Sequence, residues 1–143
     1  MFGVALHLPL NETQLRQWEY VLCHFRPDEV YLVGSERPEG IAYRRATLIR
    51  DSNDLPADVP IVLMAPQSGR VIPGNESLDT FCHPDDAIYW FGPDTSEHMN
   101  DAYLPRRADC KVYIPTDTVD QMFAHVACAV TLWDRRRFGI DAG

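Results

Sequence analysis

The sequence predicts an α/β fold in which a mainly parallel sheet is covered by helices on both faces. Segments of strand length that are apolar at nearly every position alternate with segments whose apolar residues recur at helical spacing. Continuously apolar strands are typical of parallel sheets, whose two faces are both buried. No repeat, low-complexity tract or linker interrupts the 143 residues, so we expect one domain, residues 1–143.

The first part of the chain predicts one helix and four strands. A strand is expected over Phe2–Leu8 and ends at Pro9. A helix then begins near Asn11, whose side chain can cap it, and runs to Phe25 before Pro27. The other strands of this part are expected at 29–33, 45–49 and 60–65.

The second part predicts two further strands and two helices. Ser77 can cap a short helix that ends at Phe81, after a turn at 73–75. A long helix is expected over Val119–Phe138, and the arginines at 135–137 in its last turn suit the negative end of the helix dipole. The two strands are expected at 87–91 and 111–114. The apolar face of the long helix is expected to consist of Met122, Val126, Ala129, Val130 and Trp133.

The composition is that of an acidic protein with enough apolar residues for a sizeable core. Hydrophobic residues make up 45% of the chain, charged residues 24%, and the formal net charge is −8. A chain this acidic is not expected to hold nucleic acid through a broad basic field. Twelve of the thirteen cations are arginine, however, and the fork of an arginine can bind a phosphate or carboxylate locally. These arginines cluster at 44–45, 106–107 and 135–137.

Other features of the sequence narrow the class of protein. No segment approaches the roughly 18 apolar residues needed to cross a bilayer, and no basic region precedes the apolar N-terminus. We therefore expect a cytoplasmic protein without a signal peptide, in which the four cysteines are free thiols. Neither Cys82–His83 nor His125–Cys128 has the spacing of a complete metal-ligand set, so no metal site is predicted.

Three of the apolar segments end in turns that contain Gly or Pro, at 63–66, 91–94 and 113–116. Open α/β sheets bind ligands beyond the carboxyl ends of their strands. If these three ends lie side by side, they can present main-chain N–H and C=O groups to a flat heterocycle among apolar side chains. The alternative is that Gly and Pro simply end the strands, as they do in many proteins.

The segment 83–94, His-Pro-Asp-Asp-Ala-Ile-Tyr-Trp-Phe-Gly-Pro-Asp, resembles the region of the second motif in SPOUT-class RNA methyltransferases of the TrmH type. The sequence Val-Tyr-Ile-Pro-Thr at 112–116, followed by the Ala-rich stretch 122–136, is similar to the third motif of that family. Segments 30–34 and 61–64 are similar to an early strand and to the strand that enters the family's trefoil knot. Taken in order, these segments cover essentially the whole chain.

The resemblance implies a C-terminal trefoil knot, a homodimer packed through the terminal helix, and S-adenosylmethionine held mainly by main-chain groups of the three turns. It also implies methyl transfer to tRNA or rRNA, with a ribose 2′-hydroxyl as the expected acceptor. Carried over by position, the cofactor-binding residues are Leu63, Met64, Gly92, Pro93, Ile114 and Met122. The arginine pairs on loops or strand edges are then the expected RNA-binding residues, Arg44, Arg45, Arg106 and Arg107.

Several positions depart from the motifs of this family. Asp94 replaces a glutamate in the second motif, which also lacks its second glycine, and Phe123 stands where the third motif has an asparagine. If the ring of Phe123 points inward, it either stacks on the adenine or fills its site. Counting back from Phe25 puts Tyr20 at the position of the family's catalytic arginine, whereas counting forward from Asn11 brings that position within one residue of Arg16, which is the candidate. Asp94, Glu97 and His98 are candidate substitutes for other catalytic groups.

These departures leave more than one function open. The chain is expected to be a divergent methyltransferase, in which alignment of the acceptor supplies most of the catalysis. The alternative is a non-catalytic SPOUT-like module that binds or interacts but has lost methyl transfer. A third interpretation, an unrelated small nucleotide-binding α/β protein, requires the order of the motifs to be accidental.

Overall fold

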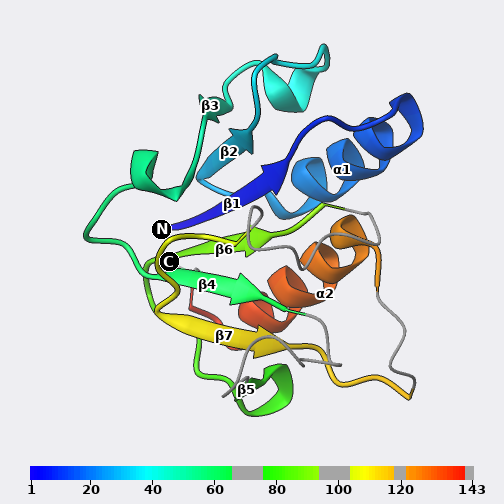
Figure 1. The fold of residues 1–143 in the computed structure, drawn as a ribbon. Coiled ribbons are helices and arrows are strands. Elements are labelled where there is room, and N and C mark those ends of the chain that lie inside the picture. Colours follow the sequence, from blue (N-terminus) through cyan, green and yellow to red (C-terminus); the bar gives the residue numbers. More distant parts are fainter. Residues whose placement is uncertain (66–75, 94–103, 118–121, 141–143) are drawn as a thin grey trace.

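The structure, a computed structural model, describes residues 1–65, 76–93, 104–117 and 122–140. Seven strands form one sheet in the order β3-β2-β1-β6-β4-β7-β5, and every pair of neighbours is parallel (Figure 1). The strands are β1 (Phe2–His7), β2 (Glu29–Val33), β3 (Thr47–Ile49), β4 (Ile61–Met64), β5 (Glu76–Ser77), β6 (Ala87–Phe91) and β7 (Cys110–Tyr113). The helices are α1 (Glu12–Phe25) and α2 (Ala124–Arg137), with 3-10 turns η1 (Ile41–Tyr43), η2 (Ser52–Asp54) and η3 (Leu78–Thr80).

The predicted α/β class and the parallel sheet are confirmed, and the predicted strands are present with ends shifted by at most two residues. Strand β5 was not expected, because two residues beside β7 are too short to show a periodic pattern. The expected trefoil knot involves the chain after Ile61, part of which lies outside the described residues, so the knot stays a prediction. No helix in the described ranges has both the length and the apolar character to cross a bilayer.

Helix α1 begins and ends where the sequence predicts, because local side-chain chemistry fixes both ends. The Asn11 side chain accepts a hydrogen bond from the Gln14 amide at 2.8 Å, and the Gln14 side chain accepts one from the Asn11 amide at 2.9 Å. This reciprocal capping box satisfies two amides that the helix itself cannot pair. At the other end, Arg26 adopts a left-handed conformation (φ 47°) and donates to the Leu22 carbonyl before Pro27 stops the helix.

Helix α2 differs from its prediction in its start and in the face that it buries. It begins at Ala124, directly after an extended Phe123 (φ −55°, ψ 142°). The predicted core face is only partly right, since Ala129 and Val130 pack against the core but Val126 and Trp133 are 38% and 57% exposed. The buried residues of α2 are instead Cys128, Thr131, Leu132, Asp134 and Arg135. The helix carries apolar residues on both sides, so their spacing alone could not identify the side that packs on the sheet.

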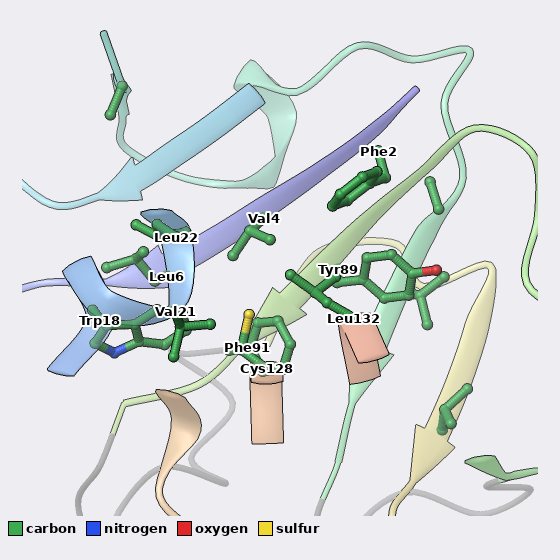
Figure 2. Packing of buried hydrophobic residues seen from close by; sticks show 14 of the residues in the cluster. Phe2, Val4, Leu6, Trp18, Val21, Leu22, Tyr89, Phe91, Cys128 and Leu132 are labelled. Carbon is green, nitrogen blue, oxygen red and sulfur yellow. The ribbon is translucent and has the colours of Figure 1, made fainter. Parts of the chain in front are cut away.

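Both α-helices pack on the same face of the sheet. Figure 2 shows Val4, Leu6 and Phe91 of the sheet against Trp18 and Leu22 of α1 and Cys128 and Leu132 of α2. On the opposite face, the described residues that cover Ala5, Leu63 and Trp90 include Leu55, Val59, Leu104 and Ala108, none of which is in an α-helix. The sheet is therefore buried on both faces as expected, but in the described ranges the second face is covered by loops instead of helices.

Candidate functional site

The three strands whose ends were predicted to form a site lie next to one another. Strands β6, β4 and β7 are consecutive in the sheet, and Met64 is level with Phe91 on one side and Val112 on the other. The Ala65 amide extends this ladder by donating to the Val112 carbonyl at 2.8 Å. Figure 1 shows the three arrows pointing the same way, so their carboxyl ends open on one edge. The predicted juxtaposition of the three strand ends is thus confirmed.

The six residues predicted to bind the cofactor at this edge are apolar residues or glycine. Leu63 is buried in the core on the face without helices. Met64 and Ile114 are half-buried against the core under the helices, and Gly92 and Pro93 are half-buried just after β6. Met122, the last of the six predicted cofactor-binding residues, is half-buried two residues before α2. Apolar side chains at adjacent strand ends suit a flat, uncharged ring system.

The same edge contains the point where the order of the strands reverses. From β1, the chain adds β2 and β3 outward on one side, whereas β6, β4, β7 and β5 lie on the other. Main-chain pairing between β1 and β6 stops at Ala5 and Trp90, while β1 continues to pair with β2 as far as His7 and Val33. The ends of β1 and β6 therefore separate, and α/β sheets bind ligands in the crevice at such a point.

His7, which sequence reasoning did not single out, bridges this separation. Its Nδ1 lies 2.7 Å from the Phe91 carbonyl oxygen, and its ring packs edge-on against Trp90 at 5.0 Å. A carbonyl only accepts, so Nδ1 carries the hydrogen. Burial lowers the pKa of His7 more than the Phe91 hydrogen bond raises it, which favours the neutral ring. The one sign of this role in the sequence was a histidine in an otherwise apolar strand.

The end of β6 is also fixed on the helix-covered face. The Phe91 ring packs edge-on against Trp18 of α1, with 5.8 Å between ring centroids and 69° between ring planes (Figure 2). Both aromatic residues are almost completely buried. The last two residues of β6 are therefore held from opposite sides, Trp90 by His7 and Phe91 by Trp18, directly before the turn at Gly92 and Pro93.

Of the three predicted catalytic residues, Arg16 is the one that lies within the described ranges. Arg16 lies on the outer surface of α1 with 74% of its side chain exposed, and its Nη2 pairs with Glu12 Oε1 at 2.8 Å, one helical turn away. Such an exposed pair adds little to stability. Asp94 and His98 lie outside the described residues.

The four arginines predicted to bind RNA have different surroundings. Arg44 and Arg45 are exposed and line a hollow of about 570 Å³ between α1 and the start of β2. Arg106 is 69% exposed and lies 3.5 Å from Asp51. Arg107 forms hydrogen bonds within its own chain, since its Nη2 donates to the Pro56 and Val59 carbonyls at 2.8 and 3.0 Å. Arg107 therefore holds its loop in place, and its contact with RNA stays a prediction.

A buried polar cluster lies where α2 ends beside the amino end of β6. His83 Nε2 donates to Asp134 Oδ2 at 2.7 Å, and the Tyr89 hydroxyl donates to His83 Nδ1 at 2.6 Å. Arg135 donates to the Tyr89 hydroxyl at 3.2 Å and, at 2.6 Å each, to the carbonyls of Pro84 and Asp85. The position of Arg135 in the last turn suggested that its side chain interacts with the end of its own helix. These three hydrogen bonds instead reach the segment around β6. Arg135 thus fastens α2 to the segment that enters β6.

The buried histidines, His7 and His83, make the stability of the fold depend on pH. Burial lowers the pKa of both below 6.5, and for His83 the charges of Arg135 and Arg137 add to this effect while Asp134 opposes it. Below pH 6.5 the unfolded chain therefore binds more protons, and the free energy of unfolding falls as the pH drops. We expect lower stability at pH 5.5 than at pH 7.5, by at most about 1.4 kcal/mol per pH unit for each histidine. Urea unfolding of the wild type and of His83→Gln at both pH values tests this. The free energy of unfolding should depend less on pH in the variant, and an equal dependence would show that His83 is not one of the groups responsible.

The Phe123 side chain lies largely in solvent. Its ring is 66% exposed and stacks on the ring of His125, with 6.0 Å between centroids and 13° between planes. A ring this exposed does not fill a buried pocket of its own chain. Phe123 also occupies the N-cap position of α2 without any side-chain cap.

Replacing Phe123 by asparagine, the residue of the family motif, is expected to stabilise the fold. An asparagine at the N-cap can accept a hydrogen bond from the first turn of α2, which is worth about 1 kcal/mol. Thermal unfolding should show a rise of a few degrees, while Phe123→Ala, which removes the ring without adding a cap, should not. A loss of stability in the asparagine variant would show that the phenyl ring contributes more than a cap.

The remaining candidate groups in the described part of the chain indicate neither a metal nor a disulfide. No three His, Cys, Asp or Glu side chains gather in an arrangement that could hold a metal ion among these residues. Cys23, Cys82, Cys110 and Cys128 are free thiols, and burial raises the pKa of the Cys128 thiol.

Comparison with known proteins relates this chain to RNA methyltransferases by structure alone. Neither a protein-family profile nor a curated protein sequence matches it. Among solved structures, it is similar to an AdoMet-bound rRNA methyltransferase from Sinorhizobium meliloti, with a TM-score of 0.70 and 18% identity over 96% of this chain and 56% of that one. The SpoU methyltransferase AviRb from Streptomyces viridochromogenes, in complex with AdoMet, matches with a TM-score of 0.70 and 12% identity over 95% and 57%. A putative RNA methyltransferase from Bacillus anthracis matches with a TM-score of 0.64 and 12% identity over 96% and 93%.

This chain has the SPOUT methyltransferase fold. The fold predicted from segments 83–94 and 112–136 is therefore confirmed. The chain spans less than two thirds of the Sinorhizobium and Streptomyces proteins.

Proposed function

We propose that this chain binds S-adenosylmethionine at the turns after β4, β6 and β7 and transfers its methyl group to RNA. The observation that carries the proposal is the juxtaposition of Met64, Phe91 and Val112 at one edge, where the strand order also reverses. Two structurally similar proteins are described with AdoMet bound, which supports the same ligand here. The apolar residues at these strand ends suit an adenosine group, and the exposed ring of Phe123 is not buried among them.

The chain's own residues would act mainly by holding and aligning. Leu63, Met64, Gly92, Pro93, Ile114 and Met122 are the residues proposed to hold the adenosine. S-adenosylmethionine supplies a methyl group on a sulfonium, and a ribose 2′-hydroxyl of tRNA or rRNA is the proposed acceptor. As the new C–O bond forms, the bond between the sulfonium sulfur and the methyl group would break, which leaves S-adenosylhomocysteine, and the hydroxyl would lose its proton. We propose Asp94 or His98 as the base that takes this proton and Arg16 as a cation near the acceptor. Alignment supplies most of the rate in such a reaction.

Calorimetric titration with S-adenosylmethionine and S-adenosylhomocysteine tests the binding step. Saturable binding in the micromolar range, about −8 kcal/mol, supports the proposal. Absence of both heat and thermal stabilisation at about a hundredfold higher concentration would overturn it for this chain. Transfer of a labelled methyl group to tRNA or rRNA, followed by alkaline digestion, then tests the chemistry, because a 2′-O-methyl group protects the adjacent phosphodiester bond.

A non-catalytic binding module is the second candidate function. The exposed, paired state of Arg16 and the replacement of the motif asparagine by Phe123 favour this alternative. The titration separates the two functions when combined with the transfer assay. Cofactor binding without methyl transfer to any RNA pool would indicate the module.

We further propose that RNA contacts the exposed arginines at the hollow beside α1. Arg44 and Arg45 form no ion pair within the described ranges, so their forks are available to phosphates, and Arg106 offers a further exposed cation. The double change Arg44→Glu and Arg45→Glu should weaken RNA binding and lower its salt dependence, without changing binding of S-adenosylhomocysteine. Arg50→Glu, an exposed arginine outside the hollow, is the matched control. Unchanged RNA affinity in the double variant would exclude this surface.

The proposed assembly is a homodimer that packs through α2. The outward face of this helix and its flanks carry exposed apolar side chains at Phe123, Val126, Trp133 and Phe138. Apolar side chains on both sides of a helix are typical of one that is covered on both sides. The inward side of α2 already packs on the sheet, so a second copy is the proposed cover for the outward side.

A further inference from the structure

The separation of β1 from β6 leaves the Phe91 carbonyl without a main-chain partner on β1. Pairing between the two strands ends at Ala5 and Trp90, one residue before Phe91. In a continuous parallel ladder, an amide of β1 would donate to this carbonyl. Here the ring of His7 donates instead, over 2.7 Å, from a position that is 6% exposed. A side chain thus replaces the ladder where the crevice begins.

We infer that His7 is a positioning residue for the cofactor site, since it fixes the Phe91 carbonyl and thereby the turn at Gly92 and Pro93. This inference rests on the proposed binding of S-adenosylmethionine at that turn. The carbonyl belongs to the last residue before the turn, so its orientation sets the direction in which the Gly92 main chain leaves the strand. The ring itself cannot shift freely, because it packs edge-on against Trp90 with 78° between the ring planes.

The geometry distinguishes a donor at Nδ1 from one at Nε2. An asparagine at position 7 places its amide N–H close to where Nδ1 lies, whereas the longer glutamine places its N–H close to Nε2. His7→Asn should therefore preserve the hydrogen bond to Phe91, and His7→Gln and His7→Leu should lose it. A residue that only fills space in the core would rank these variants by volume and apolarity instead.

Binding of S-adenosylhomocysteine and thermal unfolding, measured side by side, test the inference. We expect His7→Leu and His7→Gln to weaken the affinity about tenfold, the value of one well-formed hydrogen bond, and His7→Asn to stay within about threefold of the wild type. Ile49→Val is the matched control, because it trims a buried side chain at the carboxyl end of β3, on the same face but two strands away from β1. It should lower the melting temperature without changing the affinity.

The outcomes separate this inference from the proposed function. If the wild type does not bind S-adenosylhomocysteine, the proposed function fails and the inference fails with it. If the wild type binds and His7→Leu binds equally well, only the role of His7 is overturned. The same conclusion follows if Ile49→Val weakens binding as much as His7→Leu does. Should His7→Leu fail to fold, the comparison of His7→Gln with His7→Asn decides alone.

Discussion

Replacing Arg135 by leucine is expected to destabilise the fold by about 3 kcal/mol, which corresponds to a fall in melting temperature of about 10 °C. The guanidinium of Arg135 is 1% exposed and donates to two carbonyls and to the Tyr89 hydroxyl. It also lies 5.1 Å from the centre of the Phe2 ring. A leucine can fill part of the space but leaves the carbonyls of Pro84 and Asp85 without this donor. Unpaired buried acceptors cost more than the hydrogen bonds themselves contribute.

The neighbouring arginine provides the control for this prediction. Arg136 is exposed on the same helix turn, so Arg136→Leu changes the net charge equally and is expected to alter stability by less than about 0.5 kcal/mol. Arg135→Lys should fall between the two, because an ammonium keeps the charge but cannot reach two carbonyls as a planar fork does. Urea unfolding of the three variants measures these differences. Equal stability of the Arg135 and Arg136 leucine variants would show that the cluster does not hold α2.

Features that depend on neighbours in the sequence were predictable from it. The cap of α1 is an example, since Asn11 and Gln14 are three residues apart and the whole capping box lies within one turn. The strand ends at 64, 91 and 113 were predictable because each apolar run stops at Gly or Pro. Their arrangement on one edge followed from the expectation of a parallel sheet, in which all carboxyl ends share an edge.

Features that depend on contacts between distant segments were not predictable in this way. The role of His7 requires β6, which begins 80 residues later, to lie beside β1, and the bond itself spans 84 positions. The inward side of α2 was predicted only in part for the same reason. Arg135 is drawn inward by carbonyls about 50 residues earlier in the chain, and this turns Trp133 outward. An arginine in the last turn of a helix gives no local sign that it is buried.

Replacing the outward-facing Trp133 by glutamate is expected to convert the proposed homodimer into a monomer. In a symmetric dimer each copy loses one buried indole, and a central aromatic contributes about 2 kcal/mol, so the dimer dissociation constant should rise about a thousandfold. Tyr20→Glu is the matched control, because Tyr20 is an aromatic residue of α1 that is 71% exposed and lies off α2. Sedimentation equilibrium over a range of concentrations should find dimers for the wild type and for Tyr20→Glu, and monomers for Trp133→Glu. The indole is 57% exposed in one copy and makes little contact with its own core, so the monomeric variant should keep its fold. A wild type that is monomeric at high concentration, or a Trp133→Glu variant that still pairs, would exclude α2 as the interface.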